Sequence, residues 1–287
     1  MAEITLAAHT DDVLGEGPVH DAADNSFRWV DIMTRRWHRL DLASGAVTSL
    51  TFDTALTGFA PAASGNYVGA FWDGIALFNA DGQRSPFLHQ PEADRADNRF
   101  NDAGTDSAGR FLAGTMNMAG GSDGTLYQLG ATGRLEILRT DIGIANTIAF
   151  SPDGKILYNA DTATRDLGAY NYDPDTGTLG DRIDSFRPDP TLPGSPDGSA
   201  VDAEGYLWNA RWDGGCLIRF APDGSTDRIL DLPVEKATSC AFVGTSLYIT
   251  TATVEMTDAA RAALPMSGGL LRVDVGIEGV RRTPYAR

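Results

Sequence analysis

The sequence has very few cysteines. Cys216 and Cys240 are the only two in 287 residues, no CxxC pair occurs, and both lie in apolar, strand-like segments. Two cysteines are too few for a disulfide framework, so a small disulfide-stabilised fold is excluded. We expect both thiols to be free and buried, as unpaired cysteines in apolar segments commonly are.

Positive charge is also scarce. The chain has 23 Lys and Arg residues against 39 Asp and Glu residues, which gives a formal net charge of −16. Such a chain repels nucleic-acid phosphates and anionic membranes, so neither is expected as a partner. The charge suits a small-molecule or cation ligand instead.

Long apolar runs and a leader-like N-terminus are missing as well. No run approaches the ~18 apolar residues of a membrane-spanning helix. The first residues, "MAEITLAAHTDD", lack the basic start and the apolar stretch of a signal peptide. The sequence therefore predicts a cytoplasmic protein.

Glycine, by contrast, is abundant, with 32 residues, and it marks tight turns between short apolar runs. Turn segments followed by β-rich runs recur at intervals of about 40 to 50 residues, and each interval contains four short runs. These segments begin at His20, Pro61, Thr105, Phe150, Val201 and Phe242. Four antiparallel strands per unit form a propeller blade, so the sequence predicts an all-β, six-bladed β-propeller with residues 1–287 in a single domain.

Two segments fall outside the repeat. "EITLAAH" precedes the first unit, and we expect it to pair into the last blade, which closes the ring and removes a sheet edge. "EMTDAARAALP" is the only helix-like segment, with Thr257 or Asp258 as a cap and Pro265 as a stop.

Aligning the units on their first turn places polar residues at one shared position. Five residues before the turn stand Glu16, Asn101, Asn146 and Asp197 in four of the units. The innermost strand of a blade runs along the axis, so these side chains should converge at one mouth of the central channel. Each residue alone is also ordinary for a turn, but four in the same phase favour a site.

Burying carboxylates and amides is costly unless their charge and polarity are compensated, and a bound cation is the usual compensation. The donors are oxygens, which suit Ca²⁺, Mg²⁺ or Mn²⁺. Zn²⁺ and Fe²⁺ also accept carboxylate oxygen, so the identity of the divalent metal stays open. The four histidines show no metal-binding spacing.

The absence of several catalytic motifs limits the reactions that this ring of side chains could catalyse. GxSxG and the P-loop pattern are absent, and neither cysteine has a nearby histidine. Metal-assisted hydrolysis remains, with Asp197 as the candidate general base. Arg99 shares a face with Asn101 if the strand is extended, and it suits an oxygen-rich ligand. A surface salt bridge from Arg99 to Asp94 or Asp97 is the alternative.

Several long segments together resemble the senescence-marker-protein/gluconolactonase family, which includes regucalcin and bacterial sugar-acid lactonases. They are "LGEGPVHD", "NRFNDAGTDSAGRFLAGTM", "NTIAFSPDGKILYNADT", "SPDGSAVDAEGYLWNARWDGG" and "TSCAF", and the similarity spans nearly the whole chain. The resemblance implies one divalent metal on the axis, with ligands at Glu16, Asn146 and Asp197. It also implies that Asp197 acts as general base and that Arg99 and Asn101 bind the substrate.

The chain departs from some relatives after the "GTM" motif. Those relatives carry an acidic substrate-binding residue there, whereas this chain has Asn117 and no acid before Asp123. We interpret Asn117 as a substrate-binding residue. Loops between second and third strands return to the channel mouth, so four more residues are candidates for the pocket wall: Trp72, Asp161, Arg165 and Trp212.

The sequence therefore predicts a metal-dependent lactonase that hydrolyses an aldonolactone, such as glucono-, xylono- or arabinonolactone, to the aldonic acid. A calcium-binding regulatory propeller without turnover is one alternative, and a scaffold for protein partners is another.

Overall fold

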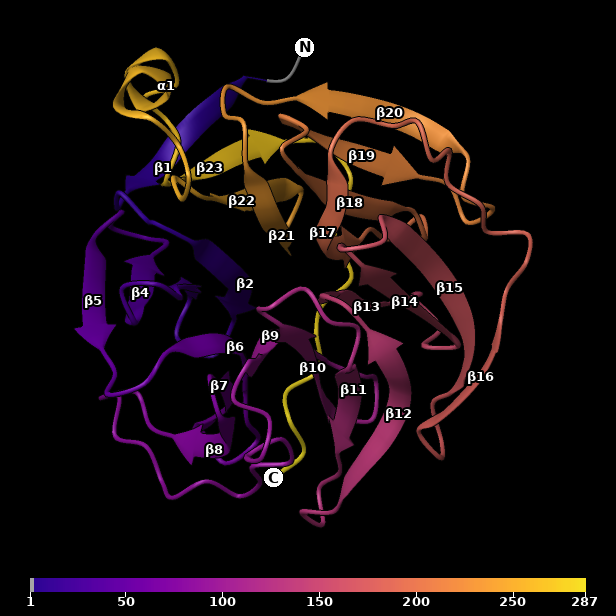
Figure 1. The fold of residues 1–287 in the computed structure, drawn as a ribbon. Helices are drawn as coiled ribbons and strands as arrows, with labels where there is room; N and C mark the ends of the chain where they lie inside the picture. The colour runs from indigo at the N-terminus through magenta and orange to yellow at the C-terminus, as the bar shows by residue number, and fades with distance from the viewer. Residues whose placement is uncertain (1–2) are drawn as a thin grey trace.

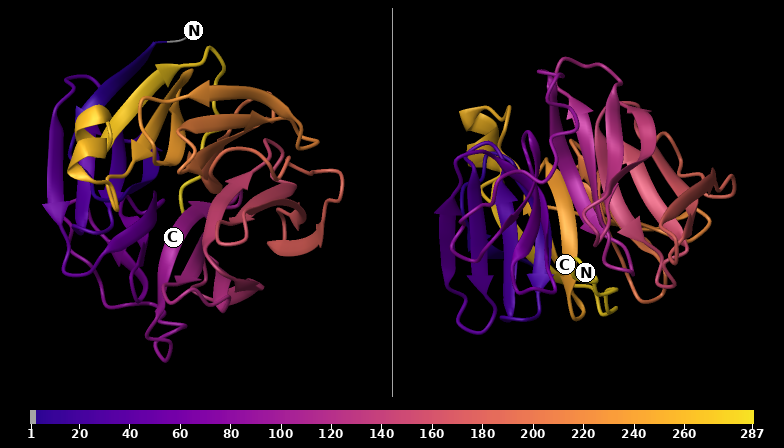
Figure 2. Two further views of the ribbon diagram at one scale, coloured as in Figure 1. Left: turned by 45° about the horizontal axis from the view of Figure 1, so that its top comes forward. Right: turned by 90° about the horizontal axis from the view of Figure 1, so that it is seen from below.

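The computed structural model describes residues 3–287, whose strands form six antiparallel sheets around a central axis (Figure 1). Figure 2 shows the ring from two other directions, with the strands of each blade running roughly along that axis. The predicted six-bladed, all-β propeller is confirmed. The interpretation of the chain as one domain stays a prediction.

The first three blades follow one another along the chain, and in each the earliest strand lies nearest the axis. Blade 1 contains β2 (Gly15–Asp21), β3 (Ser26–Asp31), β4 (Arg36–Asp41) and β5 (Val47–Thr51). Blade 2 contains β6 (Leu56–Pro61), β7 (Tyr67–Phe71) and β8 (Gly74–Phe78). Blade 3 contains β9 (Asn98–Thr105), β10 (Phe111–Asn117), β11 (Gly124–Leu129) and β12 (Leu135–Ile142).

The other three blades complete the ring. Blade 4 contains β13 (Ala145–Phe150), β14 (Ile156–Asp161), β15 (Asp166–Asp173) and β16 (Thr178–Arg182). Blade 5 contains β17 (Ser195–Val201), β18 (Leu207–Trp212), β19 (Cys216–Phe220) and β20 (Thr226–Asp231). Blade 6 contains β21 (Ala237–Val243), β22 (Ser246–Thr251), β23 (Gly269–Asp274) and β1 (Ile4–His9).

Blade 2 departs slightly from the pattern of four full strands. Its fourth run makes only isolated bridges, from Phe78 to Arg84 and from Ile75 to His89. Pro86 lies between those bridges, and proline has no N–H to give to a strand ladder.

The two segments outside the repeat behave as predicted. β1 pairs antiparallel with β23, from Ile4 opposite Val273 to His9 opposite Gly269, and so closes the ring. The helix α1 (Asp258–Ala263) lies in the connection between β22 and β23, and the Thr257 hydroxyl caps it by accepting from Ala260 N.

The core lies between neighbouring blades. Trp37 of blade 1, for example, packs edge-on against Phe59 and Phe78 of blade 2, with ring centroids 5.7 and 5.2 Å away. Cys216 and Cys240 are free and buried, as expected from the sequence. No helix among residues 3–287 is long and apolar enough to cross a membrane.

Each of the six inner strands has a pairing irregularity near the same mouth of the channel. The register shifts between Glu16 and Val19 in β2 and between Asn146 and Ala149 in β13, with similar shifts involving β6, β9, β17 and β21. Thr147, inside the β13 irregularity, has a left-handed backbone with φ of 53°. A bulge interrupts the alternation of side chains, so consecutive residues can face the channel.

Candidate functional site

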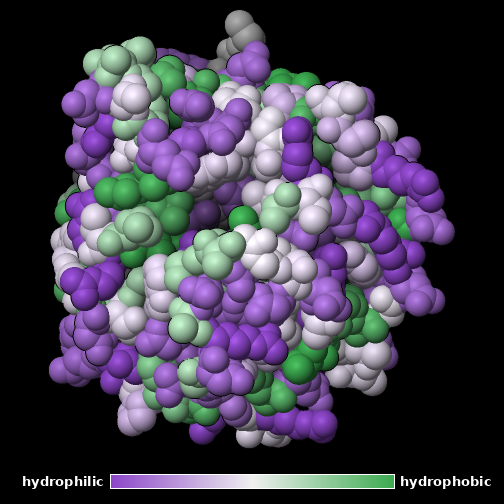
Figure 3. All heavy atoms as spheres, viewed as in Figure 1, coloured by the Kyte–Doolittle hydropathy of each residue, from purple (hydrophilic) through white to green (hydrophobic). Residues whose placement is uncertain are grey.

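The polar residues predicted to converge lie on the inner strands of blades 1, 3, 4 and 5. Their exposed fractions are 9% for Glu16, 9% for Asn101, 3% for Asn146 and 3% for Asp197. The face seen in Figure 3 is hollowed at its centre, with hydrophilic residues in the depth of the hollow. In blade 2 the equivalent residue is Thr57. In blade 6 it is Thr238, which lies next to Ser239 in the β21 bulge.

A chain of hydrogen bonds links blades 3, 4 and 5 at this level. Arg99 Nη1 donates to Asn101 Oδ1 at 2.8 Å, and Asn101 Nδ2 donates to Asn146 Oδ1 at 3.1 Å. Asn146 Nδ2 then donates to Thr162 Oγ1 at 2.8 Å, and Thr162 donates to the Pro196 carbonyl at 2.7 Å. Each amide is therefore held in a fixed orientation by its neighbours.

Asp197 is held through its main chain, whereas its carboxylate is left unsatisfied. Its carbonyl oxygen accepts from Asn209 Nδ2 at 2.9 Å and from the Thr147 hydroxyl. Its Oδ1 is buried and has no hydrogen-bond partner in the part of the chain that the structure describes. Gly198 is required beside it, because a Cβ there would lie 2.1 Å from Ser239 Oγ.

Three acidic side chains influence one another at this mouth. Burial, followed by the Asp102 charge, raises the pKa of Glu16 to about 8. Burial, followed by the charges of Glu16 and Asp102, raises the pKa of Asp197 well above its usual range. Glu16 and Asp197 also act on Arg99, whose pKa burial lowers to about 10. These mutual effects place Glu16 and Asp197 in one electrostatic environment.

The donor set fits a divalent cation that prefers oxygen. Glu16 and Asp197 supply two carboxylates, Asn146 supplies an amide oxygen, and the buried Asp197 Oδ1 lacks any donor. Residues 3–287 contain no group of three or more His, Cys, Asp or Glu side chains that could hold a metal. A site with two carboxylates and an amide depends on Asn146 as the third ligand.

Arg99 faces the site and not the surface acids considered as its alternative partners. Its side chain is buried, donates to the Phe100 carbonyl at 2.8 Å as well as to Asn101, and lies over the Trp72 ring at 5.2 Å from the ring centre. The structure shows no ion pair from Arg99 to Asp94 or Asp97. Arg99 therefore joins Trp72 to Asn101 on the inner side of blade 3.

Asn117 lies at the end of β10, where it organises its own loop. Its Oδ1 accepts from Ala119 N at 2.8 Å and Gly121 N at 3.1 Å, and its Nδ2 donates to Asp123 Oδ1 at 2.7 Å. Substrate binding by Asn117 stays a prediction, because these contacts already engage both ends of the amide.

The other loop candidates are engaged in loop contacts. The Asp161 carboxylate accepts from Gly143 N and Ile144 N, and Lys236 Nζ lies 4.6 Å from the Trp212 ring centre. Arg165 Nη2 donates to the Gly194 carbonyl at 2.8 Å. These contacts engage the three side chains within the protein, and their place in the pocket wall at the channel mouth stays a prediction.

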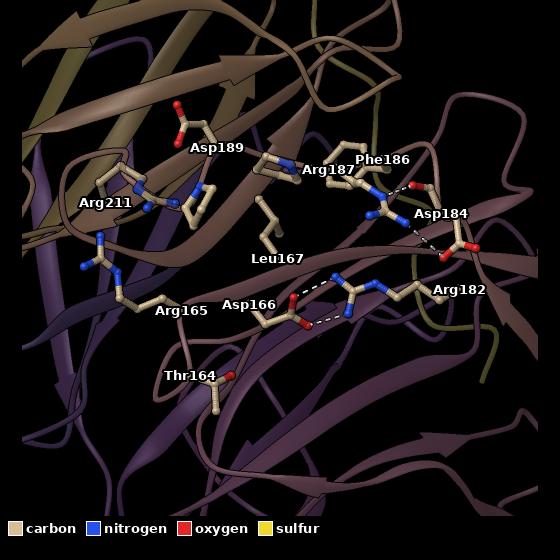
Figure 4. Close-up of a pocket in the computed structure, with 12 residues that line it drawn as sticks. Thr164, Arg165, Asp166, Leu167, Arg182, Asp184, Phe186, Arg187, Asp189 and Arg211 are labelled. Atoms are coloured by element: carbon tan, nitrogen blue, oxygen red, sulfur yellow. Dashed lines mark hydrogen bonds and ion pairs between the residues drawn. The ribbon is translucent and has the colours of Figure 1, made fainter.

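A separate pocket of about 570 Å³ lies at the rim between blades 4 and 5 (Figure 4). Arg165 and Arg211 line it, and both donate to the Gly194 carbonyl at 2.8 Å; an ion pair between Arg182 and Asp166, 2.6 Å, forms another part of its wall. None of the predicted metal ligands lines this pocket. Its arginines hold the loop that leads into β17, and so support Asp197 from outside.

Sequence reasoning missed three residues that shape the site. Asp102 follows Asn101 in the sequence, and its charge reaches both Glu16 and Asp197. Thr147 and Asn209 fix the Asp197 carbonyl. Two adjacent polar residues, Asn101 and Asp102, were visible in the sequence. In a regular strand they would point to opposite faces, and only a bulge lets both side chains face the channel.

The comparisons with known proteins agree with this architecture. The family model described as "SMP-30/Gluconolactonase/LRE-like region" matches residues 14–253. Regucalcin from Gallus gallus is 34% identical over 284 residues, 95% of each chain. Pentonolactonase XacC from Haloferax volcanii is 35% identical over 286 residues, 96% of each chain.

A solved structure is similar in three dimensions. A calcium-binding protein, regucalcin, from Agrobacterium tumefaciens superposes with a TM-score of 0.91 at 32% identity, covering 98% of this chain and 96% of that one. The similarity therefore extends through all six blades.

Proposed function

The chain belongs to the SMP-30/gluconolactonase/LRE-like family, and we propose that it hydrolyses a sugar lactone to the sugar acid with the help of one divalent cation. A lactonase among its relatives, the pentonolactonase of Haloferax volcanii, supports lactone hydrolysis. The cation would be held by Glu16, Asn146 and Asp197.

One observation carries this proposal: two buried carboxylates influence each other at one channel mouth, and neither forms an ion pair within 4.0 Å in residues 3–287. Isolated acids in such surroundings take up protons, as the raised pKa values of Glu16 and Asp197 indicate. The unsatisfied Asp197 Oδ1 points to a missing electropositive partner. Groups with perturbed pKa values in a concave polar site are typical of catalytic centres.

A cation bound by these ligands would polarise the lactone carbonyl, lower the pKa of a water molecule and favour the ionised forms of Glu16 and Asp197. Asp197 would then be placed to accept the proton of the attacking water, because its carboxylate is not neutralised by an ion pair within residues 3–287. Asn209 and Thr147 keep the Asp197 main chain in place during that transfer.

Arg99 and Asn101 orient the lactone. Arg99 carries its positive charge beside Glu16 and Asp197, where it can stabilise negative charge that develops on the lactone oxygens. Asn101 forms hydrogen bonds with both Arg99 and Asn146, so it fixes the position of the proposed substrate-binding arginine relative to the proposed metal ligand. Trp72, stacked on Arg99, offers an apolar surface to a sugar ring.

The substrate class is an uncharged, hydroxyl-rich lactone of five or six carbons. Arg99, Asn101 and Asn146 form one hydrogen-bonded row of donors and acceptors, which suits several substrate hydroxyl groups. The pentonolactonase relative supports five-carbon lactones among the first substrates to test. A cytoplasmic location stays a prediction.

Binding of calcium without turnover is the second candidate, because the similar solved structure from Agrobacterium tumefaciens is described as a calcium-binding protein. The two candidates share every ligand and differ only in hydrolysis. They are separated by measuring both metal content and turnover on the same preparation.

The test uses chelated protein reloaded with Ca²⁺, Mg²⁺, Mn²⁺, Zn²⁺ or Fe²⁺ and a panel of pentono- and hexonolactones, with acid release followed by a pH indicator. We expect hydrolysis only after reloading, and its loss in Glu16→Gln. Glu136→Gln, which changes an outer-strand glutamate paired with Arg134, is the matched control and should behave as wild type. Full hydrolysis by the chelated protein would overturn the metal-dependent mechanism, and metal binding without hydrolysis of any lactone would favour the calcium-binding candidate.

A further inference from the structure

The pocket at the rim between blades 4 and 5 gathers arginines in a chain whose net charge is −16 (Figure 4). Four arginines and three aspartates line its cavity of about 570 Å³. A cavity of this volume lies in the range that small organic ligands occupy. What the pocket can bind therefore depends on which of these charges the protein itself neutralises.

Two of the arginines are neutralised by aspartates of the same pocket. Arg182 binds Asp166 through both of its Nη atoms, at 2.8 and 2.6 Å. Arg187 Nη2 lies 3.8 Å from Asp184 Oδ1. Each of these two pairs carries no net charge.

The other two arginines, Arg165 and Arg211, have no acidic partner. Neither forms an ion pair within 4.0 Å among residues 3–287. The remaining aspartate of the pocket, Asp189, is exposed, and its Oδ1 accepts from Thr191 N and Thr191 Oγ1 at 2.8 and 2.7 Å. The lining therefore carries more positive than negative charge, and two of its arginines are not neutralised.

These two guanidinium groups are held next to one another. Arg165 Nη2 and Arg211 Nη2 both donate to the Gly194 carbonyl oxygen at 2.8 Å, and Figure 4 shows both side chains on the same side of the pocket. Arg211 is only 5% exposed. Two like charges repel one another most where water is excluded, so an anion beside them would stabilise the arrangement.

The hydrogen-bond donors that remain suit an oxyanion. Arg165 Nη2 donates to the Leu192 carbonyl as well as to Gly194, whereas the N–H groups on its Nε and Nη1 donate to no oxygen within residues 3–287. Arg211, by contrast, already uses all three of its nitrogens within the protein. Arg165 therefore offers donors and charge, and Arg211 offers mainly charge.

We propose that Arg165 and Arg211 form a binding site for the oxyanion group, a phosphate or a carboxylate, of a small organic molecule. The cavity is large enough for a body the size of a sugar beside that group. The site is separate from the candidate metal site, because none of Glu16, Asn146 and Asp197 lines the pocket. The inference goes beyond the proposed function and does not depend on it.

The test measures the binding of gluconate and of glucose 6-phosphate to the full chain by calorimetry, in the presence of a chelator, with glucose as the uncharged control. We expect saturable binding of at least one of the two anions, weaker binding as KCl is added, and no binding of glucose. Arg165→Gln should weaken anion binding about tenfold, because it removes a charge and the donors on Nε and Nη1.

Arg35→Gln is the matched control. Arg35 directly precedes β4 as Arg165 directly precedes β15, both side chains are exposed, and both backbones are left-handed, with φ of 60° and 61°. Arg35 does not line the pocket, so this variant should bind the anion as wild type does. Equal weakening in Arg35→Gln and Arg165→Gln would overturn the proposal.

A gain of affinity separates an anion site from a support for the loop. Arg165→Gln also removes two hydrogen bonds to the loop before β17, so a structural role alone could weaken binding. Asp166→Asn keeps those bonds and releases Arg182 from its ion pair, so it should tighten anion binding by a few fold. Unchanged or weaker binding in Asp166→Asn, or no binding of either anion to wild type, would overturn the proposal.

The outcome is independent of lactone hydrolysis, because the readout is anion binding by chelated protein. A chain that hydrolyses no lactone would still bind the anion at Arg165 and Arg211. A lactonase that binds neither anion would keep the proposed function and lose this second site.

Discussion

Three inner strands each have an acid or amide toward one end and an aspartate five residues later at or just beyond the other end. The acids at the two ends differ in their hydrogen-bond and ion-pair partners. The pairs are Glu16 and Asp21 in β2, Asn101 in β9 with Asp106 just after its end, and Asp197 in β17 with Asp202 just after its end. All six residues are buried. What differs between the two ends is the set of partners that the protein supplies.

At the far end every aspartate has a cation and a further donor. Asp106 binds Arg110 at 2.7 Å and the Tyr172 hydroxyl at 2.7 Å. Asp202 binds Arg219 at 2.8 Å and the indole N–H of Trp208 at 2.9 Å. Asp21, similarly, binds the Tyr67 hydroxyl and lies 3.6 Å from Arg28.

At the site end the acids lack such partners. Glu16 accepts only from Gly17 N, at 3.2 Å, among the hydrogen bonds within residues 3–287, and Asp197 Oδ1 accepts none. Acids that the protein itself neutralises stabilise turns. Acids without such a partner can be neutralised by a bound ligand instead. Partner sets, and not residue type or burial, therefore distinguish the aspartates at the far end from the proposed metal ligands Glu16 and Asp197.

The largest effect that separates the two ends is expected from Asp197→Asn. It removes the proposed general base and a proposed metal ligand, so lactone hydrolysis should fall by ~10³-fold or more. The variant should unfold at the same denaturant concentration as metal-free wild type or a higher one, because a buried acid without a partner is removed. Activity within tenfold of wild type would contradict the role of Asp197.

Asp202→Asn should show the opposite behaviour. The change breaks a buried pair with Arg219, so the free energy of unfolding should fall by about 3 kcal/mol, measured by urea denaturation. Turnover per folded molecule should stay unchanged under native conditions, because Asp202 lies at the far end of β17. A variant that keeps its stability but loses turnover would overturn the distinction between the two ends.

The pH dependence of the metal-free protein gives a third, smaller effect. The pKa of Glu16 is about 8 in the folded chain and 4.5 when unperturbed, so the folded state holds a proton that the unfolded state releases. The stability from this group is complete below about pH 4.5 and is lost as the pH rises through about 8. We expect a loss on the order of 2 kcal/mol in metal-free wild type between pH 5 and pH 8.

Glu16→Gln is the matching control, since glutamine has no proton to lose. Its loss of stability over the same pH range should be smaller than that of wild type. Urea denaturation of chelated protein at several pH values measures both. Equal losses in the two proteins would show that Glu16 is not the group responsible.

The fold could be predicted from the sequence because each blade repeats a turn of Gly, Asp, Asn or Ser between short β-rich runs. The position of Glu16, Asn146 and Asp197 could be predicted for the same reason, since the turn fixes how far each residue lies along its strand. Their burial agrees with that register. Their roles as metal ligands are part of the proposed function.

Two features could not be predicted, for different physical reasons: the place of Asp102, and the path of the C-terminal segment that brings Arg282 to the cavity lined by Ile148 and Ser199. Simple alternation would place Asp102 on the opposite side of the strand from Asn101, and only the irregularity in β9 brings both toward the channel. Arg282 lies in a segment outside the repeat, so no alignment of blades places it on the axis. Contacts that depend on bulges or on the path of a single segment leave no periodic signal.

Asn117 gives the smallest expected effect. Its amide already binds Asp123, Ala119 and Gly121, so it acts on a substrate mainly through the shape of its loop. Asn117→Ala should therefore raise the KM for the best lactone by a few fold, leave kcat nearly unchanged, and cost about 1 kcal/mol or less of stability. Asp123→Ala should reproduce the change in KM if the loop is responsible, whereas a large effect confined to Asn117 would show that its amide contacts the substrate directly.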